Sequence, residues 1–109
     1  MTTFDEREKG FEKKFALDQE QEFRAHARRD KLFGLWAAGK LGLSGTEADA
    51  YAKSIVVEDL KEAGDGDVLR KVTADFAAKG VKAVAAELTK VLAEMADKAR
   101  AQIAGEAKS

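Results

Sequence analysis

The chain of 109 residues has no cysteine and no proline, and it has a single histidine. The absence of cysteine excludes a disulfide framework and a thiolate metal site. A lone histidine cannot build the usual zinc site, and no serine is spaced from it in a way that suggests a catalytic triad. We therefore expect His26 to lie at the surface or rim of a helix, and we expect neither a metal nor another cofactor.

Long apolar runs and an excess of one charge are also missing. The longest apolar run, around residues 32–38, is broken by Gly34 and is far too short to span a bilayer. The 19 basic and 20 acidic residues nearly cancel, which argues against a nucleic-acid or membrane-surface binder. The N-terminus is charged from Asp5 onward and lacks an apolar signal region, so we expect a cytoplasmic protein. The carboxylates lie on faces expected to be exposed, and none indicates an enzyme.

The residues that are present favour helices. Charged residues make up 36% of the chain and hydrophobic residues 45%, a profile typical of a soluble helical protein. No window shows sustained alternation of apolar and polar residues, so we expect no strands. The spacing predicts an all-α fold, a four-helix bundle over residues 19–104, with a frayed tail over residues 105–109.

Caps and turns place the four helices along the chain. Asp18 is a good N-cap for a first helix that extends to about residue 38, and Ser44 with Glu47 matches the capping box of a second helix. A third helix follows the turn at residues 64–67 and ends at Gly80, and a fourth continues to about residue 103. The expected core of the last three helices consists of Ala48, Tyr51, Ala52, Ile55, Val56, Leu60, Val68, Leu69, Val72, Phe76, Val84, Leu88, Val91, Leu92, Met95, Ala99 and Ile103. We expect four aromatic residues to hold the centre: Phe33, Trp36, Tyr51 and Phe76.

The first predicted helix is polar at its start and apolar at its end. Glu20, Arg24 and Arg28 stand at i, i+4 and i+8, which predicts an exposed charge ladder. We therefore expect the first half of this helix to be solvated and the second half to dock in the core. The basic cluster from Arg24 to Lys31 is open to two interpretations, a solvated face paired with Glu20 and Glu22, or a contact for an anion or an acidic partner.

Two stretches resemble ligand-binding motifs only in part. Residues 34–40 match G-x-x-x-x-G-K, but Leu41 replaces the Ser or Thr that a phosphate loop requires, and the stretch ends a helix. Residues 65–67 begin like a calcium loop, but Leu69 occupies the next ligand position. We interpret the first stretch as a helix end and the second as a turn with helix caps.

The N-terminal segment, residues 1–18, has a different pattern. On a helix, Phe4, Phe11 and Phe15 fall within an arc of roughly 40°, which makes a thin aromatic stripe among charged residues. Each buried Phe contributes ~1.5–3 kcal/mol, but only against a partner surface, while ordering each residue costs ~1–2 kcal/mol. We therefore expect the segment to be disordered when free and to fold as an amphipathic helix in a groove. The alternative is an extra helix that packs on its own domain.

The chain resembles a known family over nearly its whole length. The run TTFDEREKGFEKKFALDQEQEFRAHARRDKLFGLWAAGKLGLSGTEADAYAK is similar to the zeta subunits that inhibit bacterial F-type ATP synthases. The later DVLRKVTADFAAKGV and KARAQI are similar as well, and RRDKLFGLWAA is the most specific part.

The resemblance implies a regulatory inhibitor with a four-helix bundle. In this family the N-terminal segment inserts as a helix into a catalytic interface of the ATP synthase head, between an alpha and a beta subunit and near the rotor shaft. The implied location is peripheral to the inner membrane, through the ATP synthase. Carried onto this chain, the expected partner-binding residues are Phe4, Arg7, Glu8, Phe11, Lys14, Phe15 and Leu17. The alternatives are a helical protein-interaction module, and a nucleotide-sensing module with a weak nucleotide contact on the face from Arg24 to Lys31, neither with inhibitory action.

Overall fold

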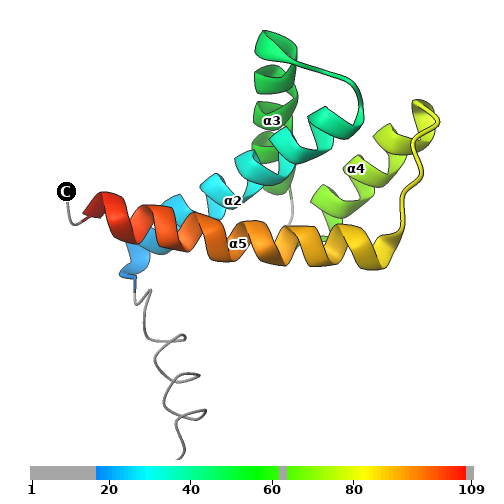
Figure 1. Ribbon diagram of the computed structural model, residues 1–109. Helices are drawn as coiled ribbons and strands as arrows, with labels where there is room; N and C mark the ends of the chain where they lie inside the picture. The colour runs from blue at the N-terminus through cyan, green and yellow to red at the C-terminus, as the bar shows by residue number, and fades with distance from the viewer. Residues whose placement is uncertain (1–16, 62–63, 108–109) are drawn as a thin grey trace, which may run out of the picture.

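The computed structural model describes residues 17–61 and 64–107, and these ranges contain four α-helices and no β-strand (Figure 1). The helices are α2 (Gln19–Lys40), α3 (Gly45–Asp59), α4 (Gly66–Ala78) and α5 (Ala85–Ala107). The predicted all-α, four-helix fold is confirmed. The last helix extends to Ala107, into the stretch where we expect a frayed tail.

Helix α2 is the centre of the domain. It packs mainly against α5 and α3, while α4 closes the end of the core between α3 and α5. Figure 1 shows α2 and α5 running side by side in roughly opposite directions, with α3 crossing α2 steeply. The first half of α2 contacts the last turns of α5, and most of its residues are exposed, as expected; Ala25 and Arg29 are the exceptions and are buried.

Glycine ends both α2 and α4 in the same way. After the C-cap Leu41, Gly42 adopts a φ of 80°, and the Leu43 N–H donates to the Ala38 carbonyl at 2.9 Å. Gly80 repeats this turn with a φ of 72°. A positive φ costs glycine little, and the turn satisfies carbonyls that the helix end leaves open. The expected end of the third helix at Gly80 is therefore confirmed.

Apolar residues from all four helices form one continuous core. Phe33 and Phe76 are fully buried, and the Trp36 ring lies between them, 5.8 Å from the Phe33 ring and 6.1 Å from the Phe76 ring. Tyr51 packs at the edge of this core. The expected aromatic centre is confirmed, with Trp36 and Tyr51 only partly buried. The buried core cluster consists of Phe33, Ala37, Leu41, Ile55, Val68, Val72, Phe76, Leu88, Val91 and Leu92.

Three predictions at helix ends are wrong. Leu60 is 73% exposed because α3 ends at Asp59 and Leu60 is its C-cap, so its side chain leaves the apolar stripe. Val84 is 46% exposed because it lies just before the first residue of α5. Its carbonyl accepts the Leu88 N–H, but its side chain does not join the apolar stripe of the helix. Ser44 occupies the N-cap of α3, but its side chain makes no capping hydrogen bond, so no capping box forms there.

Candidate functional site

Most of the predicted partner-binding residues precede the described part of the chain. Phe4, Arg7, Glu8, Phe11, Lys14 and Phe15 lie outside the described residues. Leu17 is the first described residue, and its side chain is half-buried beside the start of α2. The structure therefore locates the point where the N-terminal segment joins the four-helix domain.

A capping box closes α2 at this junction. The Asp18 carboxylate accepts from the Gln21 N–H at 2.7 Å, and the Gln21 side-chain oxygen accepts from the Asp18 N–H at 3.0 Å. Asp18 has a ψ of 178°, which is extended backbone and interrupts the helix at this residue. The predicted N-cap is confirmed. The first turn of α2 is thus capped by Asp18 and Gln21.

The basic cluster from Arg24 to Lys31 is divided between the core and the surface. Arg29 is 7% exposed, so neither interpretation of the cluster, a solvated face or a contact for a partner, holds for this residue. Its guanidinium donates from Nε at 3.0 Å and from Nη2 at 2.7 Å to Asp30 Oδ1, and from Nη1 to Asp65 Oδ1 at 2.9 Å. Nη2 also lies 3.5 Å from Asp59 Oδ2. Because Asp59 ends α3 and Asp65 precedes α4, Arg29 connects three elements of the fold.

Asp30 is the most deeply buried charged residue among those the structure describes, with 1% of its surface exposed. The pKa of its carboxyl is raised from 3.8 to about 7, first by burial and then by a hydrogen bond with Asp59, and Arg29 only partly opposes the shift. The pKa of Arg29 is also raised: burial lowers it, but its bonds to Asp30 and Asp65 outweigh that effect. The carboxyl of Asp30 therefore keeps its proton to a much higher pH than an exposed aspartate does.

His26 lies at the rim of this cluster, as predicted. Its side chain is 51% exposed, and its Nε2 lies 2.5 Å from Asp59 Oδ2 and 3.1 Å from Arg29 Nη2. Ligand atoms of His26, Asp59 and Asp65 lie within 4.8 Å of one another, a spacing that could suit a metal ion. The Arg29 guanidinium already occupies the space between them and supplies the positive charge that these groups need. The donor set fits an internal ion-pair cluster better than a metal site.

The other arginines bind the last turns of α5. Arg28 donates to Glu106 at 2.8 Å and to Gln102 at 2.8 Å, and Arg24 lies 3.4 Å from Glu106. The expected ladder with Glu20 is therefore wrong, because a carboxylate from α5 is the nearer partner. The hydrogen bond from Arg28 lowers the pKa of Glu106, with the charges of Arg28 and Arg24 adding to the effect.

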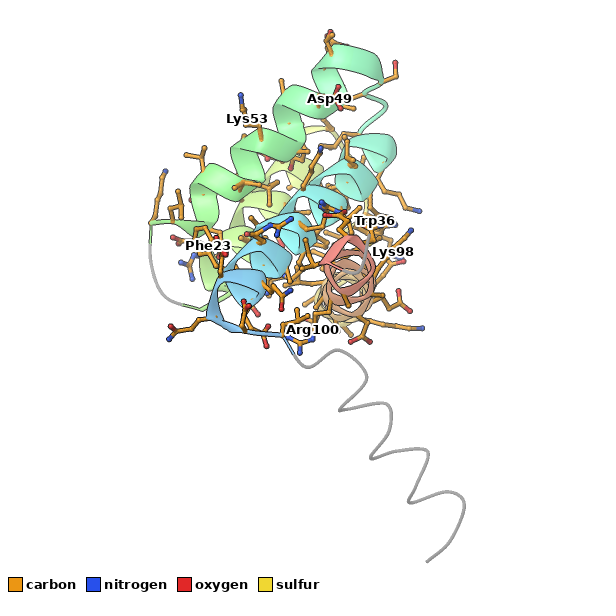
Figure 2. All side chains as sticks on the ribbon, turned by 90° about the vertical axis from the view of Figure 1, so that its left-hand side faces the viewer. Phe23, Trp36, Asp49, Lys53, Lys98 and Arg100 are labelled. Atoms are coloured by element: carbon orange, nitrogen blue, oxygen red, sulfur yellow. The ribbon has the colours of Figure 1, made fainter. Side chains whose placement is uncertain are left out.

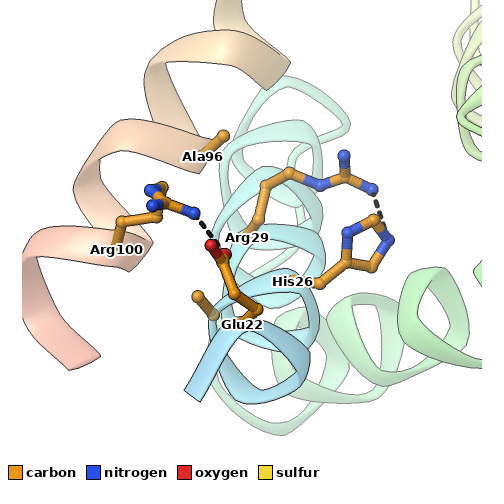
Figure 3. Close-up of a pocket in the computed structure, with 6 residues that line it drawn as sticks. Glu22, His26, Arg29, Ala96 and Arg100 are labelled. Atoms are coloured by element: carbon orange, nitrogen blue, oxygen red, sulfur yellow. Dashed lines mark hydrogen bonds and ion pairs between the residues drawn. The ribbon is translucent and has the colours of Figure 1, made fainter. Parts of the chain in front are cut away.

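A shallow pocket lies between α2 and α5 beside this seam. Figure 3 shows Glu22 and Arg100 joined across it, with Arg29 turned toward His26 on the far side of α2. Glu22 is therefore paired with Arg100 of α5. Both arginines that approach the pocket have carboxylate partners, which disfavours an anion or nucleotide site there.

The partial phosphate-loop motif is part of a continuous helix. Gly34 lies in the middle of α2, and a Cβ placed on it would come within 2.6 Å of Ala52 Cα. Gly34 is therefore required by the close approach of α3. The calcium-like stretch is the start of α4, with Asp65 at the N-cap position, although the Asp65 side chain pairs with Arg29 and makes no capping hydrogen bond.

The sequence reading missed Asp30, although a signal for it exists. Asp30, Phe33 and Ala37 stand at i, i+3 and i+7, so Asp30 shares the apolar face of α2. A carboxylate on an apolar stripe, directly after an arginine, indicates a buried ion pair with a partner elsewhere in the chain.

Comparisons with known proteins agree with this geometry. The chain matches the family described as ATPase inhibitor subunit zeta over residues 1–102. A protein solved in solution by NMR is 45% identical, with a TM-score of 0.70, and the match covers 78% of this chain and 96% of that one. No curated protein matches.

The described residues form a four-helix domain whose buried charges are paired internally, and the family match assigns it to a class of regulatory inhibitors. The chain belongs to the ATPase inhibitor subunit zeta family, whose members bind F-type ATP synthase and inhibit it. The expected family and the expectation that the chain is no enzyme are thereby confirmed. Among the described helices, none combines the length and the apolar character needed to traverse a bilayer.

Proposed function

We propose that this chain inhibits ATP hydrolysis by inserting its N-terminal segment, residues 1–18, as a helix into the catalytic head of the F-type ATP synthase. The segment enters an interface between an alpha and a beta subunit, near the rotor shaft. The observation that carries the proposal is the extent of the family match, which begins at residue 1 and so includes the segment as well as the helices.

The described domain supports a division of roles. Every buried core residue of the described ranges lies between Ala25 and Ile103, so the four described helices form a core with one another. The capping box at Asp18 likewise satisfies the start of α2 with the residue that immediately precedes the helix. The aromatic stripe of Phe4, Phe11 and Phe15 is then available to a partner, where each ring contributes ~1.5–3 kcal/mol on burial.

The test is a titration of ATP hydrolysis by purified ATP synthase. Phe11→Ala and Phe15→Ala should each weaken inhibition, with an affinity loss on the order of 2–4 kcal/mol if both rings are central anchors. Lys9→Ala is the matched control, since position 9 lies roughly 140° from the stripe on a helix. Deletion of residues 1–17, which keeps the Asp18 cap of α2, should abolish inhibition and leave the helical circular dichroism signal of the domain.

The proposal fails if the deletion variant still inhibits. It also fails if Phe11→Ala lowers the melting temperature by several degrees and leaves inhibition unchanged, because the ring would then belong to the core. The alternative of a nucleotide-sensing face gains no support, since Arg24 and Arg28 share Glu106 and Arg29 is buried.

A further inference from the structure

A groove runs along the seam between α2 and α3. Two hollows line this seam, and they share Lys31 and Val56, so they form one continuous depression. It extends from Asp49 near the start of α3 to Phe23 and Ile103, where α5 ends against α2. The groove is lined by Phe23, Ala27, Lys31, Ala50, Lys53 and Val56.

The floor of the groove is apolar and includes an exposed aromatic ring. Phe23 is 69% exposed, whereas Phe33 and Phe76 are buried. Figure 2 shows Phe23 on the side of α2 that faces away from α5. An exposed Phe ring on a helix takes no part in the core of its own domain, and it can serve as an anchor at a protein interface.

The rim of the groove is positively charged. Lys31 and Lys53 are exposed, and neither forms an ion pair within residues 17–61 and 64–107. Arg24 and Arg28 line the Phe23 end and together share one carboxylate, Glu106. Asp49 is the acidic residue that lines the other end. The cations therefore outnumber the carboxylates around an apolar floor.

We propose that this groove is a second docking surface of the inhibitor, and that it takes an amphipathic helix with acidic flanks from the catalytic head of the ATP synthase. The proposal rests on the proposed function, which places the head next to the N-terminal segment. Phe23 stands five residues after Asp18, about 7.5 Å along the helix axis, so the groove opens beside the point where the segment leaves the domain. A partner that holds the segment meets the Phe23 end of the groove first.

The occupant follows from complementarity. An acidic partner helix gains ion pairs with the unpaired Lys31 and Lys53 while its apolar stripe covers Phe23 and Val56. The charges accelerate and orient the encounter, and the ring supplies the buried contact. A basic or neutral helix would leave the two lysines desolvated without partners.

The experiment measures binding of the full-length chain to the purified catalytic head by biolayer interferometry at low and high salt. The double variant Lys31→Glu/Lys53→Glu should weaken binding at least about tenfold at low salt and reduce the salt dependence. Phe23→Ala should weaken it about three- to tenfold at both salt concentrations. The matched control is Lys90→Glu/Lys98→Glu on α5, which should stay within about twofold; Figure 2 shows Lys98 on the opposite side from Lys53.

Inhibition measured on the same variants separates this proposal from the proposed function. Groove variants should still inhibit fully at saturating concentration, whereas Phe11→Ala weakens inhibition and keeps the salt dependence of binding. If Phe11→Ala leaves inhibition unchanged while the groove variants weaken binding, the result counts against the inserted segment and not against the groove. If both groove variants bind as tightly as the wild type, the proposed docking surface is refuted. A wild-type chain that does not bind the head overturns both.

Two other occupants would also overturn the proposal. If Phe11→Ala shifts the NMR signals of Phe23 and Val56 in the free chain, its own segment covers the groove. If sedimentation shows a dimer that Phe23→Ala dissociates, the groove is an interface between two copies of the chain.

Discussion

Gly34 offers the sharpest test of the packing between α2 and α3. A Cβ added at this position would lie 2.6 Å from Ala52 Cα, 3.1 Å from Ile55 Cγ1 and 3.2 Å from Ala52 Cβ. The closest atom belongs to the α3 backbone, so a rotamer change cannot relieve the overlap. For Gly34→Ala the two helices must separate, which opens the core around Ile55.

The size of the effect is the balance of two terms. Overpacking a well-packed core costs about 1–3 kcal/mol, and a clash with backbone belongs at the upper end of that range. Alanine returns up to ~1 kcal/mol through its better helix propensity. We expect a net loss of about 2 kcal/mol, which lowers the melting temperature of a domain this size by about 8–16 °C.

The same helix provides the control. Gly39 is also helical, has no positive φ and would have no atom within 4 Å of an added Cβ. Gly39→Ala should therefore stabilise the domain by up to ~1 kcal/mol. Thermal unfolding followed by circular dichroism at 222 nm measures both variants. If Gly34→Ala were as stable as the wild type, the close approach of α2 and α3 would be refuted.

Three further predictions address the ion-pair cluster, the junction and the segment. The raised pKa of Asp30 means that the wild type loses stability as pH rises from about 4 to about 7. Asp30→Asn should remove this pH dependence, so the stability of the variant relative to the wild type should increase between pH 4 and pH 8. Melting temperatures of both proteins across this pH range test the prediction, and parallel curves would contradict it. Asp18→Ala should cost ~1 kcal/mol in urea unfolding through loss of the cap, and an unchanged midpoint would argue against that hydrogen bond. Gly10→Ala should tighten inhibition by at most about fivefold, because alanine lowers the cost of ordering a helical segment; weaker inhibition would refute one continuous bound helix.

Much of the fold follows from signals that act within a few residues. Asp18 and Gly80 mark helix ends because their hydrogen bonds and backbone angles involve only adjacent turns. The stripe from Leu88 to Ile103 indicates the buried face of α5 because helical spacing alone brings those side chains together. Leu60 shows the limit of this reasoning, because the spacing continues past the residue where the helix ends.

The placement of charges could not be derived in the same way. Arg29 and Lys31 look alike on the sequence, yet one is buried and the other is exposed. The difference depends on Asp59 and Asp65, which approach Arg29 only after α3 and α4 fold back on α2. Arg28 likewise pairs with Glu106 because α5 returns along α2, so a carboxylate far away in sequence is nearer than Glu20.

The sequence by itself determined the helical class, the order of the helices and the family, since these depend on composition, periodicity and local motifs that survive without knowledge of neighbours. The tertiary structure alone decided that Gly34 must lack a side chain, that Asp30 is buried and that Phe23 is exposed at one end of a groove that Lys31 also lines. Each of these depends on how two helices approach each other. That approach is set by the summed packing of the whole core, which no short stretch of sequence contains.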